Sequence, residues 1–149
     1  MPLRVSVILF MCAAAFFAAE APAEKPITPD HALDRLTKAY VFGFGGIGFA
    51  GTIPEGEIAF RALLARSSAA RDFEAAFVRG TPQAKAYALV GLREVNSNRF
   101  AELAGSLQAS SIEVQTMQGC LMNKLPMSKL VERIKAGEYS SPKTRKPVP

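Results

Sequence analysis

The sequence is poor in the residues that usually bind metals. It contains one histidine, His31, and two cysteines, Cys12 and Cys120. The HExxH, EF-hand and CxxC patterns are absent, and these are spacings with which a chain commonly surrounds zinc or calcium. One histidine and one cysteine complete a zinc site only with two further carboxylates. We therefore expect no metal site and no cofactor.

The sequence also lacks an apolar run long enough to span a membrane, which takes roughly 20 residues. Its uncharged apolar stretch Val5–Ala19 follows one basic residue, Arg4, and precedes the A-x-A pattern of Ala21 and Ala23. A short apolar segment with these flanks is typical of a secretory signal peptide. We expect residues 1–23 to be removed and the remaining chain to be periplasmic or secreted.

The exported chain would keep one cysteine, Cys120, and so have no internal disulfide. A lone thiol in an oxidising compartment is buried, reactive or bridged to another chain, and the sequence leaves all three open. The net charge is +5, but the basic residues form no stripe interleaved with aromatic residues, so we expect no nucleic-acid partner. The end of the chain, 139–149, is rich in proline and serine and is expected to be a disordered basic tail.

Helical periodicity dominates residues 24–138, which we expect to form one all-α domain of five to six short helices. Thr28 and Thr81 each precede a proline, as is common at a helix start. Thr52 stands three residues before Glu55, the spacing of a capping box. The predicted helices begin at Pro29, run from about Ile53 to Arg66, end at Gly80, and cover Pro82–Val95, Asn96–Gln108 and Met127–Gly137.

A faint repeat relates two of the predicted helix pairs. A shift of 27 residues places Phe60 on Tyr87 and Phe73 on Phe100. Each copy would be two helices joined by a short turn, and the copies would stack as αα-hairpins. The chain thus has a weak resemblance to HEAT-like helical arrays.

One segment, near 112–118, resists a helical interpretation. Ile112, Val114 and Thr116 alternate as in a strand, although other apolar residues nearby keep helical spacing. We expect a short extended segment here. Its only expected partner is Tyr40–Phe44, the other stretch rich in strand-forming residues.

The stretch GFGGIGFAG, Gly43–Gly51, contains the pattern G-x-G-x-x-G twice. In dinucleotide-binding folds such glycines let the backbone approach a pyrophosphate at the edge of a parallel sheet. The rest of the chain lacks the alternating strands of such a sheet, and no lysine follows the glycines as in a P-loop. We interpret the stretch as a packing loop whose phenylalanines fill the core, and expect no nucleotide partner. Membrane contact by the uncharged segment Ala39–Pro54 is not expected, because it is too short to span and lacks a basic face.

Few residues suggest catalysis. In the exported chain, His31 and Cys120 are the one possible Cys–His pair for nucleophilic chemistry. A histidine near a helix start is more typical of a surface or capping residue, and a cysteine beside apolar residues is more typical of a small buried hydrophobe. Glu55 and Glu57 lie in the first turn of a predicted helix, where acids complement the helix dipole. General acid–base catalysis is their alternative role.

The stretches GTIPEGE (Gly51–Glu57) and TMQGC (Thr116–Cys120), and a helix ending in IKAGEY, resemble small exported bacterial helical proteins of uncharacterised function. The resemblance covers most of the exported chain and implies no activity, ligand or catalytic residue. It suggests that the glycine loop and the Gly119–Cys120 step touch each other. We expect a non-enzymatic module of the cell envelope that binds a protein partner; the alternative is a small thiol-dependent enzyme or redox protein using Cys120, assisted by His31 or by Glu55 and Glu57.

Overall fold

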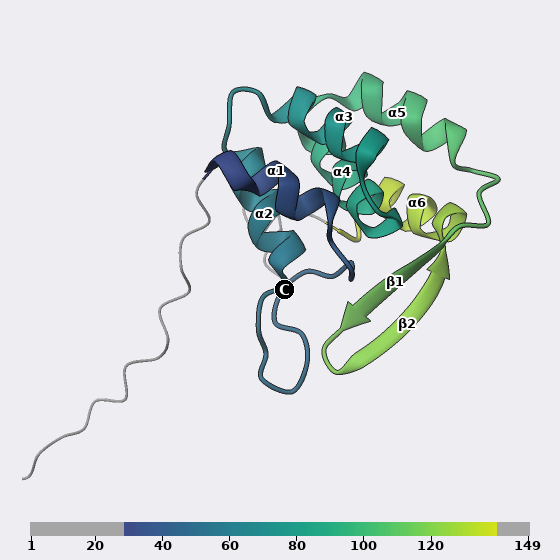
Figure 1. Ribbon diagram of the computed structural model, residues 1–149. Coiled ribbons are helices and arrows are strands. Elements are labelled where there is room, and N and C mark those ends of the chain that lie inside the picture. The colour runs from purple at the N-terminus through teal and green to yellow at the C-terminus, as the bar shows by residue number, and fades with distance from the viewer. Residues whose placement is uncertain (1–28, 140–149) are drawn as a thin grey trace, which may run out of the picture.

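The computed structural model describes residues 29–139, which form six helices and a two-stranded antiparallel sheet (Figure 1). The prediction of an all-α fold is therefore correct in that the chain is predominantly helical, but it did not include the sheet. The predicted signal peptide 1–23, Thr28 and the chain after Tyr139 lie outside the described residues. The elements are α1 (Pro29–Thr37), α2 (Glu55–Leu64), α3 (Ala69–Arg79), α4 (Pro82–Val95), α5 (Ser97–Ser106), β1 (Glu113–Gln118), β2 (Leu121–Pro126) and α6 (Met127–Lys135).

Helix α4 lies at the centre of the helical part. It packs against each of the other five helices and against β1. Its residues are buried without interruption from Ala86 to Leu92, as expected for a helix that is apolar on nearly every side. Gly91 lets the ring of Phe73 from α3 approach closely, because a Cβ at Gly91 would lie 2.4 Å from a ring carbon. The arrangement of the helices here is therefore set by close packing of their side chains.

Local signals set the boundaries of α4, α5 and α6. Thr81 Oγ1 accepts a hydrogen bond from Ala84 N at 3.2 Å, which confirms Thr81 as the N-cap of α4. Asn96 ends α4, and its Oδ1 accepts from Arg99 N at 3.2 Å to start α5. Gly137, with φ of 85°, follows the end of α6 as predicted.

The predicted capping box at Thr52 is not formed. Helix α2 begins at Glu55 after Pro54, which makes no side-chain capping bond. Thr52 instead pairs with Ile47, whose backbone N donates to Thr52 O at 2.9 Å. A bridge that closes the preceding loop therefore takes the place of the expected cap.

Helices α2 and α3 follow one another across a short turn, as do α4 and α5, in the order expected of two αα-hairpins. The repeat-related residues Phe60 and Tyr87 are both fully buried. Helix α1 ends at Thr37, so Tyr40 lies beyond it and is 71% exposed. No helix within residues 29–139 has the length and apolar character needed to cross a membrane.

The hairpin of β1 and β2 pairs from Glu113↔Pro126 to Gln118↔Leu121 around the turn Gly119–Cys120. Gly119 has φ of 55°, at the first position of a two-residue turn where positive φ is common. Strand β1 confirms the expected extended segment. Strand β2 was not expected, because LMNKLP contains no β-branched or aromatic residue.

The predicted partner of β1, Tyr40–Phe44, contributes a single parallel bridge. Phe42 N donates to Gln115 O at 2.8 Å, and Met117 N donates to Phe42 O at 2.9 Å. The segment before the glycine loop is thus joined to one edge of β1, while β2 occupies the other edge. The prediction found a true contact but missed the main partner.

Candidate functional site

The glycine loop, Gly43–Gly51, lies beside the hairpin turn at one end of the molecule (Figure 1). Gly48 N donates to Gly119 O at 2.8 Å, which confirms the expected contact between the loop and the Gly119–Cys120 step. The loop needs glycine to follow this path, because side chains strongly disfavour positive φ. The φ angles are 83° at Gly45, 70° at Gly48 and 61° at Gly51.

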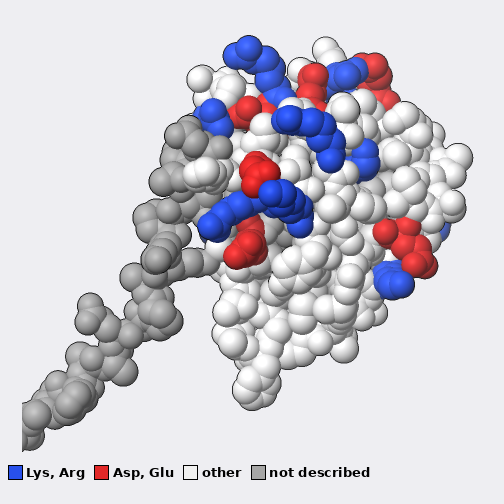
Figure 2. Space-filling view, in the orientation of Figure 1, with Lys and Arg blue, Asp and Glu red and all other residues white. Residues whose placement is uncertain are grey.

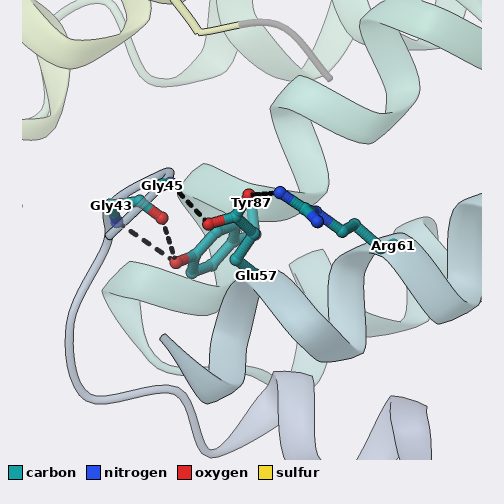
Figure 3. Close-up of polar contacts among 5 residues, drawn as sticks. All are labelled: Gly43, Gly45, Glu57, Arg61 and Tyr87. Atoms are coloured by element: carbon teal, nitrogen blue, oxygen red, sulfur yellow. Dashed lines mark hydrogen bonds and ion pairs between the residues drawn. The ribbon is translucent and has the colours of Figure 1, made fainter. Parts of the chain in front are cut away.

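Two buried side chains hold the base of the glycine loop (Figure 3). Tyr87 Oη, from α4, donates to Gly43 O at 2.7 Å and accepts from Gly43 N at 3.1 Å. Glu57 Oε2, from α2, accepts from Gly45 N at 2.6 Å. Both side chains are fully buried, where losing a hydrogen-bonding partner is costly. The base of the loop is therefore fixed by directional bonds.

Glu57 is a buried carboxylate with a cation beside it. Its Oε1 accepts from Arg61 Nη2 at 2.5 Å, and the Arg61 side chain is 41% exposed. Glu57 is thus not the solvent-facing acid at a helix start that its position suggested. Glu55, two residues earlier, is exposed and fits that role. The structure gives the two glutamates separate roles and does not combine them in an acid–base pair.

Gly56, between the two glutamates, lets the ring of Tyr87 pass close to α2. A Cβ at Gly56 would lie 2.5 Å from Cε2 of Tyr87, so a larger residue would displace the ring from Gly43. Burial raises the pKa of Tyr87, and its hydrogen bond to Gly43 partly opposes this rise. The Tyr87 hydroxyl is therefore protonated at neutral pH and able to donate to Gly43 O.

Five amide groups of the glycine loop donate within the protein. Those of Gly43 and Gly45 donate to the two anchoring side chains, and those of Ile47, Gly48 and Gly51 donate to backbone oxygens. A phosphate cradle needs several amides directed at the anion. The buried carboxylate next to Gly45 would also repel one. The geometry therefore favours the packing interpretation of these glycines.

The far end of the loop and the start of β2 carry exposed apolar side chains, which we call the apolar tip and define as Phe49, Leu121 and Met122. Their exposed fractions are 103%, 71% and 54%. Figure 2 shows no charged side chain over this lower end of the molecule, and segments 39–54 and 114–123 contain no charged residue. The expectation that the loop phenylalanines fill the core is wrong for Phe49, because the bridge between Ile47 and Thr52 turns residues 48–51 outward.

Cys120 is exposed in the hairpin turn, so the expectation of a small buried hydrophobe is wrong. A turn at the end of a two-stranded sheet has no core beside it in which a side chain could be buried. His31 is exposed in the first turn of α1, and within the described residues no hydrogen bond or ion pair joins it to Cys120. Across the same residues, no three His, Cys, Asp or Glu side chains are grouped to hold a metal ion.

A cavity of about 320 Å³ lies between the glycine loop, the hairpin and the end of α6. Its volume is at the lower end of the range for small-molecule sites. The residues of this cavity are spread over four segments, so sequence spacing did not reveal them. The stretches singled out in the sequence, Tyr40–Phe44, TMQGC and IKAGEY, each include some of them. Its lining includes Phe42, Phe44, Thr116, Asn123, Arg133 and Tyr139.

Arg133 and Tyr139 form a charged and aromatic wall of this cavity. The guanidinium carbon of Arg133 lies 5.4 Å from the centroid of the Tyr139 ring. Arg133 Nε donates to Glu138 Oε2 at 2.5 Å, and this bond raises the pKa of Arg133. Burial raises the pKa of Tyr139, while the charge of Arg133 opposes that rise. At neutral pH this wall therefore places the Arg133 cation, paired with Glu138, beside a neutral phenol.

Comparison of the chain with protein-family models, curated proteins and solved structures finds no match. The resemblances to exported bacterial proteins and to HEAT-like arrays therefore stay predictions. The functional interpretation of the glycine loop, the apolar tip and the cavity rests on their geometry.

Proposed function

We propose that this chain is an exported, non-enzymatic helical protein that binds a protein partner in the cell envelope through the apolar tip. One observation carries the proposal: Phe49 is 103% exposed at the end of a loop whose base is held by two fully buried side chains. Apolar side chains gathered at one exposed place often mark an interaction surface. The predicted signal peptide supports the envelope as the location.

The construction of the tip suits binding. A loop that is already ordered loses little conformational freedom when a partner binds it, so more of the contact energy appears as affinity. Aromatic side chains and methionine are enriched at the centres of protein interfaces. Phe49 in the loop and Met122 at the start of β2 offer both kinds of side chain. The absence of charge in segments 39–54 and 114–123 lowers the desolvation cost of covering them.

A photoreactive amino acid at position 49 tests this proposal in cells that produce the protein. We expect a discrete covalent adduct with one envelope protein. The matched control is the same amino acid at position 78, because Val78 is an exposed apolar residue of α3 in the helical part, with an exposed fraction of 72%. Equal adducts from both positions, or none from position 49, would contradict the proposal.

The variant Phe49→Ser provides a second measurement on the unlabelled protein. We expect it to reduce capture of the cross-linked partner at least about tenfold, as for the loss of a central interface residue. Val78→Ser should leave capture unchanged. Both variants should keep the urea midpoint of the parent protein, because both side chains are exposed.

The second candidate function is a thiol-dependent enzyme or redox protein, and the exposure of Cys120 is the observation in its favour. A reactive cysteine needs a nearby cation or base to stabilise its thiolate. Thiol alkylation kinetics at neutral pH separate the two functions. A rate close to that of a free thiol in a short peptide supports the binding module, whereas a rate at least about tenfold higher supports the thiol enzyme.

A further inference from the structure

The cavity beside the glycine loop combines an aromatic floor with a polar mouth. The rings of Phe42 and Phe44 lie with their centroids 5.6 Å apart, and that of Tyr139 is 4.9 Å from Phe42. Thr116 and Asn123 are directly opposite one another in the hairpin, so their side chains share the face that lines the cavity. A bound molecule would thus meet apolar rings at one side and hydrogen-bonding groups at the other.

Helix α4 holds two walls of the cavity in place. Tyr87 binds both backbone groups of Gly43 on the loop side. Six positions later, Arg93 donates from Nη2 to Tyr139 O at 2.6 Å and from Nη1 to Ile134 O, and so fixes the chain at the end of α6. The walls are therefore set by the buried helical part before any ligand arrives, which favours binding.

Hydrogen-bonding capacity directed toward the cavity is left unused inside the protein. Arg133 engages Glu138 through Nε, and in the described part of the chain its two Nη groups have no hydrogen-bonding partner. The same holds, within residues 29–139, for the side-chain amides of Gln118 and Asn123, which also line the cavity. A guanidinium with free Nη groups is suited to hold a carboxylate.

The charges around the cavity favour an acid over an amine. Its lining contains two cations, Lys124 and Arg133, and one acid, Glu138. Arg133 pairs with Glu138, and Lys124 Nζ lies 3.5 Å from Oε2 of Glu113 on the neighbouring strand, outside the lining. The ring of Tyr139 already has the Arg133 guanidinium beside it, at 5.4 Å, so a ligand amine would meet a like charge there. We propose that this cavity binds a small amphipathic carboxylic acid, with its apolar body on the rings of Phe42, Phe44 and Tyr139 and its carboxylate on Arg133.

Calorimetric titration of the purified protein with phenylbutyrate tests the proposal, with phenylbutanol and phenylbutylamine as probes of matched shape. For a ligand of this size we expect a dissociation constant on the order of 0.1–1 mM. The alcohol and the amine should bind at least about tenfold more weakly, because neither replaces the charge-assisted bond to Arg133. No saturable binding of the acid, or equal affinity for the acid and the alcohol, would overturn the proposal.

Variants locate the binding. Arg133→Gln removes the cation and should weaken phenylbutyrate at least about tenfold, whereas Arg71→Gln, which removes an exposed cation of α3, should leave affinity unchanged. Asn123→Phe narrows the mouth from an exposed strand position that tolerates an aromatic residue, and it should also weaken binding tenfold. This third variant decides the matter if Arg133→Gln does not fold. Full affinity in Asn123→Phe, or an equal loss in Arg71→Gln, would refute the cavity as the site.

Discussion

The helical part of the molecule and its loop–hairpin end are held together by different forces. In the helical part, α3 and α4 pack so closely that Gly91 has no room for a Cβ beside Phe73. At the loop–hairpin end, the chain is held by hydrogen bonds from Tyr87, Glu57 and the backbone of the hairpin turn. Removing buried side-chain volume leaves a cavity and lowers the stability of the whole packed region. Removing one hydrogen bond at the loop–hairpin end affects mainly the segment that this bond holds. The two regions should therefore respond differently to single substitutions.

The largest effect is expected in the helical part. Phe73→Ala removes a fully buried ring next to Gly91 and should lower the free energy of unfolding by about 3–5 kcal/mol. Phe49→Ala makes the same substitution at the apolar tip, where the ring is exposed, and should change the free energy of unfolding by less than about 0.5 kcal/mol. Urea unfolding followed by circular dichroism measures both. Similar losses in the two variants would erase the distinction between the regions.

Glu57→Ala should come next, with a loss of about 1–3 kcal/mol, because Gly45 N loses its buried acceptor and Arg61 loses its ion pair. The helical part should stay folded, so hydrogen exchange should accelerate mainly at the amides of the glycine loop. Glu55→Ala, the exposed neighbour, is the control and should cost less than about 1 kcal/mol. Uniform acceleration across α3 and α4 would show that the two regions are not separable.

Tyr87→Phe should cost about 1–2 kcal/mol, since both backbone groups of Gly43 lose a partner. It should also change the response to alkaline pH. Burial raises the pKa of Tyr87 above about 10, its value in the unfolded chain. The folded state then holds more protons than the unfolded state, so this contribution is complete below pH 10 and is lost as pH rises further.

Urea midpoints measured at a series of alkaline pH values test this dependence. The parent protein should lose stability from about pH 10 upward, and Tyr87→Phe should lose less. Some decline should persist in the variant, because burial also raises the pKa of Tyr139. Parallel curves for the parent protein and the variant would mean that Tyr87 contributes nothing to the alkaline loss.

The smallest effect concerns two glycines in unlike settings. Gly48 has φ of 70° in the loop, so Gly48→Ala should destabilise by about 1 kcal/mol. Gly105 lies in α5, where a Cβ meets no atom within 4 Å, so Gly105→Ala should stabilise by about 0.5–1 kcal/mol. Thermal unfolding should show a lower midpoint temperature than the parent protein for Gly48→Ala and a higher one for Gly105→Ala. The same sign in both would contradict the assigned backbone conformation of the loop.

Most of the helical part could be predicted from the sequence, because its signals are local. The Thr81–Pro82 start of α4, the apolar run through Leu92 and the stop at Gly80 each depend on residues close together in the chain. Met127, Leu130, Val131 and Ile134 likewise have the i, i+3, i+4, i+7 spacing of one helix face, and all four are buried in α6. In these helices the local conformational preference agrees with the tertiary packing, so hydrophobic periodicity alone predicts them.

The loop–hairpin end was harder to predict because its bonds join residues distant in sequence. Glu57 is held by Gly45 and Arg61. Of these two partners, only Arg61 lies at the i, i+4 spacing that a helix brings together, so only this contact could be predicted. Strand β2 owes its conformation to pairing with β1 and not to its own residues. The exposure of Cys120 follows from its place in a turn that the sequence did not identify as one.

Tyr87 and Arg93 leave the same rigid helix, and this has a consequence for how the protein could vary. Their attachment points are offset by roughly 9 Å along the axis of α4, at 1.5 Å per residue. An insertion or deletion between them would rotate one side chain away from its backbone partner and release either Gly43 or Tyr139. The distance between these two residues along α4 therefore sets the relative positions of two walls of the cavity, although no residue of α4 lines it.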